Sequence, residues 1–260
     1  MFADSHCHLN FPDLAAQLPE ILDRMRTNRV TQALCVSVNL TDWPGLMQMV
    51  DSQPGLWASV GVHPDYEDTP EPSVEELVEL ASTPKVVAIG ETGLDYFRLT
   101  GDLEWQRDRF RRHIQAARQT RKPLIIHTRA AAEDTLRLMQ EEGASEAGGV
   151  MHCFTESQAV ADAALAMNFY ISFSGIVTFK SARDLQDVAR AVPLDRLLIE
   201  TDSPYLAPVP FRGRQNDPSK VIHVAEKIAE LRGMTVADVA RVSTENFFRL
   251  FNGIDPAHHV

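Results

Sequence analysis

Short runs of apolar and β-branched residues recur along the chain, and longer stretches richer in polar residues separate them. Runs of this length that are bounded by turn-forming residues are typical of buried β-strands. Eight of them can be recognised, and we predict a strand in each: residues 2–6, 33–38, 56–61, 85–90, 124–127, 149–153, 169–174 and 196–201.

The stretches between these runs carry the spacing of helices. Residues 103–120 place three apolar side chains at i, i+4 and i+7, on one helical face: Phe110, Ile114 and Ala117. A capping-box pattern at residues 73–76 predicts the start of a second helix, and a weaker version at 235–238 predicts the start of another.

Regular alternation of strand and helix predicts parallel strands with covering helices. Eight evenly spaced units indicate an α/β protein built as a single (β/α)8 TIM barrel over residues 1–260. A doubly wound open sheet is the alternative, but no glycine-rich phosphate loop follows any of the runs. The polar, Pro-rich stretch 207–219 follows the last run, and we expect an active-site loop there and not a domain boundary.

The charge balance limits the partners that the protein can have. Its 25 basic and 36 acidic residues give a net charge of −11, which argues against coating of nucleic acid through counterion release. Bound cations could still bring a phosphate group to such a surface. Three cysteines are too few for a disulfide framework, no export signal is evident and no apolar run approaches ~20 residues. We therefore expect a cytoplasmic protein without a membrane segment.

Ionisable residues collect where the predicted strands end. In the segment DSHCHL, His6 and His8 are two residues apart, so both imidazoles would point to one side of a strand. Because all strand ends of a barrel meet at the rim that carries active sites, side chains from five further strands should converge with this pair. These are His63, Glu91, His127, His152 and Asp202, whereas His258 and His259 resemble a terminal tail.

A single histidine or carboxylate at a strand end is more often a hydrogen-bonded structural residue than a metal ligand. Glu200 illustrates this, since it could be a buried carboxylate bonded to nearby backbone. When several such residues converge on one place, metal binding becomes the better interpretation. Burying these groups together without a cation costs several kcal/mol. Six residues would then be ligands: His6, His8, Glu91, His127, His152 and Asp202.

Six ligands exceed the needs of one tetrahedral site and suit two divalent ions roughly 3.5–4 Å apart. We place Glu91 between the ions as a bridging carboxylate. One ion would also take His6, His8 and Asp202, and the other His127 and His152. The mixed ligands suit Zn²⁺ or Mn²⁺, and Mg²⁺ is possible although it prefers more oxygen ligands.

Several segments together resemble the TatD family of metal-dependent hydrolases, and within it the YcfH-like branch. They are DSHCHL, GVHP, GETGLDY, IIHTR, MHCF, YISFSGIVTF and ETDSPYLAPVPFRG, which are spread over nearly the whole chain. The resemblance implies a (β/α)8 barrel with a binuclear metal site and the same six ligands. It also implies deoxyribonuclease activity of the 3′–5′ exonuclease type, on DNA ends or short single-stranded nucleic acid.

The leading hypothesis is hydrolysis of a phosphodiester by a water that the two ions activate. Asp202 could accept the proton of this water, and His63 could contact a phosphate oxygen or assist the leaving group. Arg129 and Arg212 are candidate phosphate clamps, with surface salt bridges as the alternative. Two rings, those of Tyr96 and Phe154, could stack on a terminal base or simply pack within loops.

Two other functions remain open from the sequence. An amidohydrolase acting on a C–N or ester bond of a small molecule would use the same activated water, although no strand-four lysine of the kind that bridges metals in related amidases is present. A metal-stabilised scaffold would normally need only about four ligands in a closed site. No exposed apolar stripe stands out, so we expect a monomer.

Overall fold

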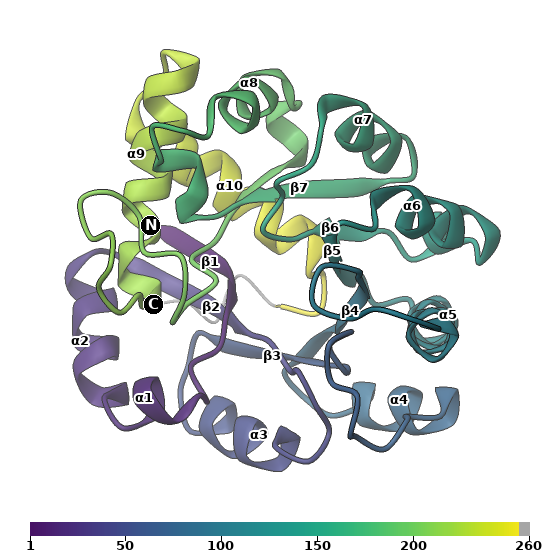
Figure 1. The fold of residues 1–260 in the computed structure, drawn as a ribbon. Coiled ribbons are helices and arrows are strands. Elements are labelled where there is room, and N and C mark those ends of the chain that lie inside the picture. Colours follow the sequence, from purple (N-terminus) through teal and green to yellow (C-terminus); the bar gives the residue numbers. More distant parts are fainter. Residues whose placement is uncertain (255–260) are drawn as a thin grey trace.

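The computed structural model describes residues 1–254, so His258 and His259 of the expected tail lie outside the described residues. Eight parallel strands follow one another around a barrel in the order in which they occur in the sequence (Figure 1). They are β1 (Phe2–Cys7), β2 (Val30–Cys35), β3 (Leu56–Val60), β4 (Val86–Asp95), β5 (Leu124–Arg129), β6 (Gly149–Met151), β7 (Phe169–Phe173) and β8 (Leu197–Ile199).

Helices surround the strands on the outside of the barrel (Figure 1). They are α1 (Pro12–Ala15), α2 (Leu18–Thr27), α3 (Trp43–Asp51), α4 (Val74–Ala81), α5 (Glu104–Thr120), α6 (Ala132–Glu141), α7 (Gln158–Ala166), α8 (Arg183–Ala191), α9 (Val221–Arg232) and α10 (Val236–Leu250). Short 3-10 turns are η1 (Ala144–Glu146), η2 (Gly175–Thr178), η3 (Leu194–Arg196) and η4 (Pro218–Lys220). None of the helices in residues 1–254 is long and apolar enough to cross a membrane.

The predicted barrel is confirmed, and the open doubly wound sheet is excluded because the strand order is sequential. Strand β2 begins three residues before the predicted start, and β4 continues to Asp95 beyond the predicted end at residue 90. Both predicted caps are present. The Ser73 hydroxyl accepts a hydrogen bond from the Glu76 backbone, and Thr235 caps α10 in the same way.

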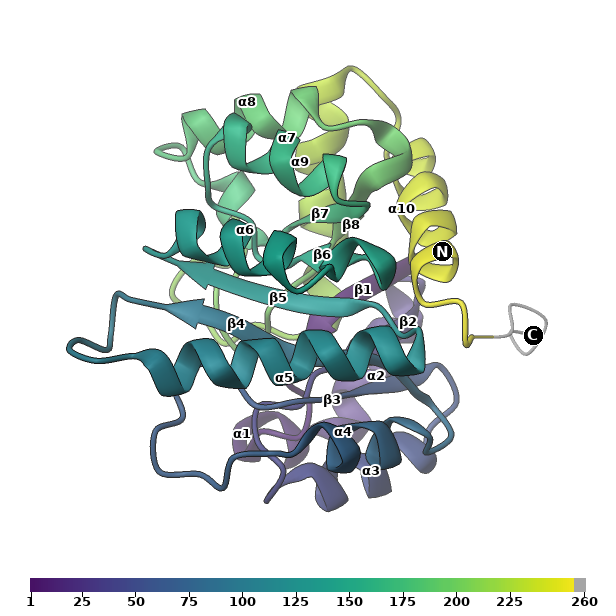
Figure 2. The ribbon, with the colours of Figure 1, turned by 90° about the vertical axis from the view of Figure 1, so that its right-hand side faces the viewer.

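The amino-terminal end of the barrel is filled with apolar side chains and closed by α10. Phe247 and Phe251 are fully buried and pack with residues of the strands, among them Leu34, Val87 and Ile125. Figure 2 shows α10 at this end, whereas the arrowheads of β4 and β5 point to the opposite end. The carboxyl ends of the strands are therefore free to form a site.

The barrel closes between β8 and β1 by a small number of specific bonds. In residues 1–254, the two strands share an isolated bridge between Cys7 and Ser203 instead of a continuous ladder. The His8 amide donates to the Ser203 carbonyl, and the Asp202 amide donates to the His6 carbonyl, each at 2.9 Å. This closing seam therefore runs directly through the residues expected to bind metal.

Candidate metal centre

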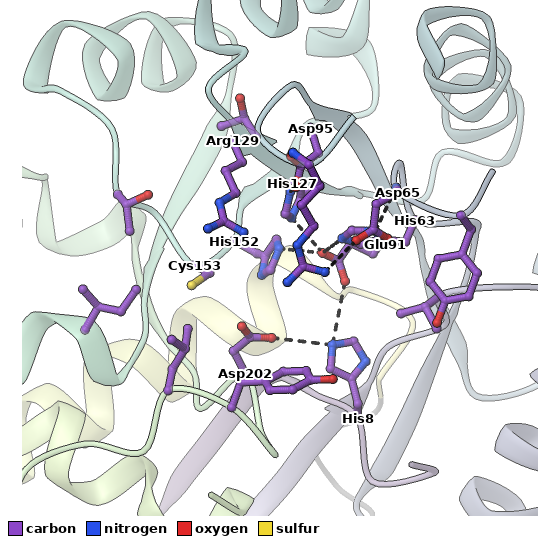
Figure 3. A pocket seen from close by; sticks show the side chains of 18 of the residues that line it. His8, His63, Asp65, Glu91, Asp95, His127, Arg129, His152, Cys153 and Asp202 are labelled. Atoms are coloured by element: carbon purple, nitrogen blue, oxygen red, sulfur yellow. Dashed lines mark hydrogen bonds and ion pairs between the residues drawn. The ribbon is translucent and has the colours of Figure 1, made fainter. Parts of the chain in front are cut away.

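Glu91, near the middle of β4, lies at the centre of the converging side chains (Figure 3). Its Oε2 atom is 3.3 Å from Nε2 of His6 and 3.8 Å from Nε2 of His8. Its Oε1 atom is 2.8 Å from Nε2 of His152 and 3.2 Å from Nδ1 of His127. The two carboxylate oxygens thus face two different groups of imidazoles, as a bridging ligand would.

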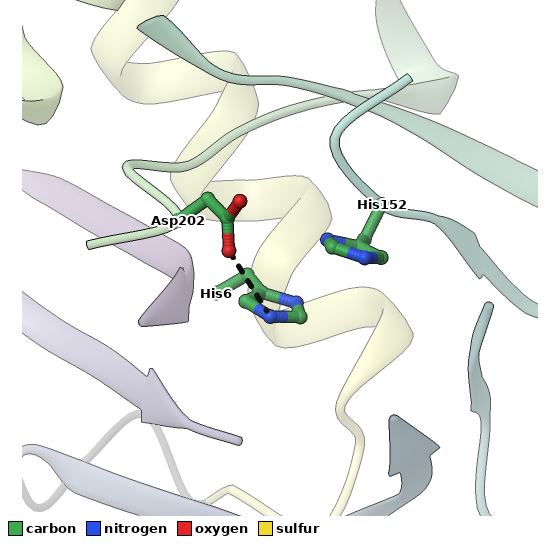
Figure 4. A group of neighbouring side chains, drawn as sticks. All are labelled: His6, His152 and Asp202. Carbon is green, nitrogen blue, oxygen red and sulfur yellow. Dashed lines mark ion pairs between the residues drawn. The ribbon is translucent and has the colours of Figure 1, made fainter. Parts of the chain in front are cut away.

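Asp202 completes the group around the Oε2 side. Its Oδ1 atom is 3.5 Å from Nε2 of His8 and 3.7 Å from Nε2 of His6. The two histidine nitrogens are themselves 3.2 Å apart, so the predicted orientation of this pair to one place is found. Figure 4 shows Asp202 beside the rings of His6 and His152, which stack at 3.9 Å between centroids.

His63 also lies in this cluster, where the sequence argument expected it at the same rim without counting it as a ligand. Its Nε2 atom is 3.3 Å from Glu91 Oε1. Three sets of side chains bring their ligand atoms within 4.8 Å of one another: His6, His152 and Asp202; His6, His8 and Glu91; and His63, Glu91 and His127. All six sequence-predicted ligands are therefore brought together, and His63 is a seventh candidate.

The geometry fits divalent cations. Two ligand atoms about 2.0–2.1 Å from one Zn²⁺ in a tetrahedral arrangement lie roughly 3.3 Å apart, which is close to the 3.2 Å between the His6 and His8 nitrogens. Nε2 of His152 is buried and makes no hydrogen bond, although it lies 2.8 Å from the Glu91 oxygen. A buried nitrogen close to a carboxylate, but not oriented to bond to it, is available to a cation.

A second set of acceptors orients four of the imidazoles. The nitrogen that faces away from Glu91 meets an oxygen acceptor in each case, as is usual for metal-binding histidines. The pairs are His8 Nδ1 with the Val36 carbonyl at 3.1 Å, His63 Nδ1 with Asp65 at 2.5 Å, His127 Nε2 with Asp95 at 3.0 Å and His152 Nδ1 with Glu200 at 3.3 Å.

The charges of the cluster are strongly coupled. Burial by itself raises the pKa of the Glu91 carboxyl, but the surrounding imidazoles outweigh burial and hold this pKa well below its usual range. Burial likewise opposes ionisation of His63, yet Glu91 and Asp65 raise the pKa of His63 to about 9. The cluster therefore keeps its carboxylates ionised, which is the form that binds a cation.

Two glycines allow Glu91 to occupy this position within the motif GETGLD. Gly93 has a φ of +130°, and a Cβ atom there would lie 2.0 Å from the carbonyl oxygen of His127 on the neighbouring strand. Gly90 has a φ of +143°, and a Cβ atom would lie 2.7 Å from the carbonyl oxygen of Ile125. Strands β4 and β5 can approach each other around Glu91 only because both positions lack a side chain.

A pocket of about 650 Å³ opens above the cluster. Arg129 lines it, as the sequence argument expected, and its guanidinium lies 3.9 Å over the ring of Phe97. Arg98 lines it too and pairs with Asp65 at 3.1 Å. Both arginines thus line the pocket that also contains Glu91.

Three predicted substrate contacts are not found at this pocket. Arg212 is exposed and packs over Phe179 at 3.7 Å, and it is not among the lining residues. Tyr96 is also outside the lining, because its hydroxyl bonds to Asp134 at 2.7 Å. Phe154 is only 2% exposed and packs in the apolar core, so its ring is not available to a base. Both rings thus pack within the protein in this structure.

The stretch 207–219 was expected to be an active-site loop, but it contributes none of the residues that line the pocket. Its contribution is to hold the backbone near Asp202 through hydrogen bonds. The Asn216 side-chain amide donates to the carbonyls of Thr201 and Tyr205, at 3.0 and 2.7 Å. These bonds hold the segment that carries Asp202 against the end of β1.

The sequence argument gave no role to the orienting carboxylates. Asp65 and Asp95 each follow a ligand-bearing strand end by a few residues, which is the only signal that could have identified them. Glu200 was considered as a structural carboxylate, and it does accept a bond from the Cys153 amide at 2.9 Å. Its second contact, with His152, connects it to the cluster.

Comparison with known proteins agrees with this geometry. Residues 3–252 match the family model described as TatD related DNase. The chain is 46% identical to the uncharacterized metal-dependent hydrolase YcfH of Escherichia coli, covering 96% of this chain and 95% of that protein. It is 43% identical to the uncharacterized metal-dependent hydrolase YabD of Bacillus subtilis, covering 96% and 99%.

A solved structure shares the same architecture. The crystal structure of YjjV, a TatD homolog from Escherichia coli, superposes with a TM-score of 0.89 at 28% identity, covering 96% of this chain and 98% of that chain. The match of the family model over nearly all of the chain, together with two relatives above 40% identity, identifies the family. The chain therefore belongs to the TatD family of metal-dependent hydrolases.

Proposed function

We propose that this protein is a deoxyribonuclease that hydrolyses phosphodiester bonds at DNA ends, in the manner of a 3′–5′ exonuclease, with two divalent ions. The observation that carries the proposal is the position of Glu91. Its two oxygens face separate groups of histidines across 2.8–3.8 Å, which is the arrangement of a carboxylate shared by two ions.

The ligands divide between the ions as follows. His6, His8, Asp202 and Oε2 of Glu91 would hold one, and His127, His152 and Oε1 of Glu91 would hold the other. When bound, Zn²⁺, Mn²⁺ or Mg²⁺ supplies a Lewis acid for the phosphoryl oxygen and lowers the pKa of a water towards neutrality. His63, whose Nε2 lies 3.3 Å from Oε1, is left outside both groups and lines the pocket where a phosphate would lie.

The residues of the chain supply the proton transfers and the positioning. Asp202 lines the pocket, and its carboxylate accepts the proton of the attacking water, a general-base role that contributes roughly 10²–10⁴-fold in rate. His63 donates to a phosphate oxygen through the imidazole that Asp65 orients. Arg129, on the far side of the pocket, holds the next phosphate.

Hydrolysis of defined substrates tests this function. Purified protein is given single-stranded and 3′-recessed DNA with Mg²⁺, Mn²⁺ or Zn²⁺, and then chelator. Release of mononucleotides that chelator abolishes is the expected result. Glu91→Ala should lower the rate roughly 10³-fold, because each ion contributes several kcal/mol to the transition state. Glu245→Ala, which alters an exposed carboxylate paired with Arg241, is the matched control.

The same preparation is tested against amides and lactones. Turnover of one of these compounds, with no release of nucleotides under any metal, would contradict the deoxyribonuclease and favour an amidohydrolase. Light scattering after gel filtration tests the expected monomer, and cell fractionation tests the expected cytoplasmic location.

A further inference from the structure

The exposed aromatic rings of this protein gather at one place. In residues 1–254, three large aromatic side chains are exposed: Tyr66 (36%), Phe97 (64%) and Tyr205 (57%). Tyr66 and Tyr205 line the pocket above the metal centre, and Phe97 lies beneath Arg129, which also lines it. Exposed aromatic side chains that gather at the mouth of one pocket mark a candidate binding surface.

Tyr205 is held close to the metal centre. Its backbone amide donates to the carbonyl of Asp202 at 3.0 Å, and its own carbonyl accepts from the Asn216 side chain at 2.7 Å. With its backbone fixed at both ends and its ring exposed, Tyr205 presents a rigid flat surface within three residues of a proposed ligand.

A second ring links Tyr205 to the metal centre. Phe11 stacks on His8 with 4.8 Å between ring centroids, and the Phe11 ring meets Tyr205 edge-on at 6.4 Å. His8, Phe11 and Tyr205 therefore form a continuous aromatic wall from the cluster to the rim. Anything bound to the ions would have this wall beside it.

The other side of the pocket carries two arginine side chains. Arg98 and Arg129 line it there, next to Asp95 and His127, and Figure 3 shows Arg129 and Asp95 across the pocket from His8 and Asp202. A ligand that satisfies both sides needs an anionic group and a flat ring. The volume of about 650 Å³ lies within the range of roughly 300–1,000 Å³ for pockets that hold small molecules.

We propose that Tyr205, supported by Phe11, stacks on the nucleobase next to the phosphate bound at the metal centre, so that this site selects phosphates that carry a base. The proposal rests on the proposed function, because it takes the anionic group to be a nucleotide phosphate. Stacking on an aromatic side chain accepts every base, so selection would be for the presence of a base and not for its identity.

Equilibrium binding tests the proposal without any need for turnover. The affinity of the Mn²⁺-loaded protein for deoxyadenosine 5′-monophosphate is compared with its affinity for 2-deoxyribose 5-phosphate, which lacks the base, by calorimetry. We expect the nucleotide to bind at least roughly 10-fold more tightly to the natural protein. Tyr205→Ala should remove this difference and leave the affinity for the sugar phosphate unchanged, whereas Tyr205→Phe should keep the difference.

Val209→Ala is the matched control, since Val209 is an exposed apolar residue of the same loop and does not line the pocket. It should behave as the natural protein. Equal affinity of the natural protein for both ligands would overturn the proposal, and so would an unchanged preference in Tyr205→Ala. Thermal melting of each variant confirms that it is folded.

Failure of this proposal can be distinguished from failure of the deoxyribonuclease function. DNA cleavage with equal binding of the two ligands would support the function and contradict the stacking role. A clear preference for the nucleotide that Tyr205→Ala abolishes, without cleavage of any phosphodiester, would contradict the function and support the stacking role.

Discussion

The carboxylate of Glu200 accepts a hydrogen bond from Nδ1 of His152 at 3.3 Å, on the side of the ring that faces away from Glu91. This contact fixes the orientation of a ring whose Nε2 atom is buried and available to a cation. Glu200 Oε1 contacts the cluster through His152 and also accepts from the Cys153 amide.

Glu200→Gln should therefore weaken metal binding without removing a ligand. We expect the affinity for Zn²⁺ or Mn²⁺ to fall 10–100-fold, roughly the effect of losing an acceptor behind a metal-binding histidine. Chelator competition measures this change. The control is Glu226→Gln, because Glu226 pairs with His223 away from the centre. Unchanged affinity in the Glu200 variant would contradict an orienting role.

Asp4 should contribute to stability at the closing seam between β8 and β1. It is fully buried, and Oδ1 accepts from the Thr201 amide at 2.9 Å while Oδ2 accepts from the Thr201 hydroxyl at 2.5 Å. Asp4→Ala leaves the Thr201 amide and hydroxyl hydrogens without their acceptors, and we expect a loss of about 3 kcal/mol in the free energy of unfolding.

Asp4→Asn distinguishes lost bonding from lost charge. Its amide oxygen can still accept from the Thr201 backbone, and its NH2 group can donate to the Thr201 hydroxyl. We therefore expect chemical denaturation to show a smaller loss for Asp4→Asn than for Asp4→Ala. An equal loss in both variants would contradict stabilisation of the seam by hydrogen bonding between Asp4 and Thr201.

His113, which bonds to the residue preceding His63, should make stability depend on pH. Its Nε2 accepts from the Val62 amide at 3.0 Å, so Nδ1 carries the proton and donates to the Arg109 carbonyl at 2.8 Å. Burial lowers the pKa of His113 to about 4. The unfolded chain, with a pKa near 6.5, thus takes up a proton that the folded chain excludes.

The sign of the effect follows from this difference. The stabilising contribution is complete above pH 6.5 and is lost as the pH falls from 6.5 towards 4. Between pH 7 and pH 5 we expect the free energy of unfolding to fall by about 2 kcal/mol more in the natural protein than in His113→Gln. Denaturation at both pH values measures this, with His223→Gln as control. Parallel curves for the natural protein and His113→Gln would contradict the prediction.

Arg129 should act on DNA through its charge. Arg129→Ala should raise the KM for single-stranded DNA roughly 10-fold, the effect of one charged hydrogen bond. It should also lower the slope of log affinity against log salt concentration by about 0.7, since one fewer phosphate is neutralised. Arg137→Ala, at an arginine paired with Glu141 on α6, is the control. An unchanged salt dependence in Arg129→Ala would place Arg129 outside the DNA contact.

The sequence predicted the barrel and the converging residues for one physical reason. The order of the strands and the points at which they end determine where the backbone carrying each side chain lies. The locations of His6, Glu91 and Asp202 therefore follow from the topology. The direction of a ring does not follow from topology. Phe154 comes directly after a strand end, and nothing in its neighbours indicates that it turns into the core.

The sequence argument missed the carboxylates that orient the histidines for a related reason. Asp65 follows β3 in a loop and Asp95 is the last residue of β4. They bind the far nitrogens of His63 and His127, and no sequence period predicts such contacts. The aromatic wall shows the same limit. Phe11 and Tyr205 are 194 positions apart, and only the folded chain brings them into contact.

The seam between the first and last strands has a consequence for biosynthesis. His6 and His8 are synthesised before the other side chains around Glu91, and Asp202 follows His8 by 194 residues. A nascent chain therefore carries only part of its ligand set until most of the polypeptide has been made. The complete ligand set is in this way tied to closure of the barrel, so a fragment that ends before Asp202 would lack one of the residues around Glu91.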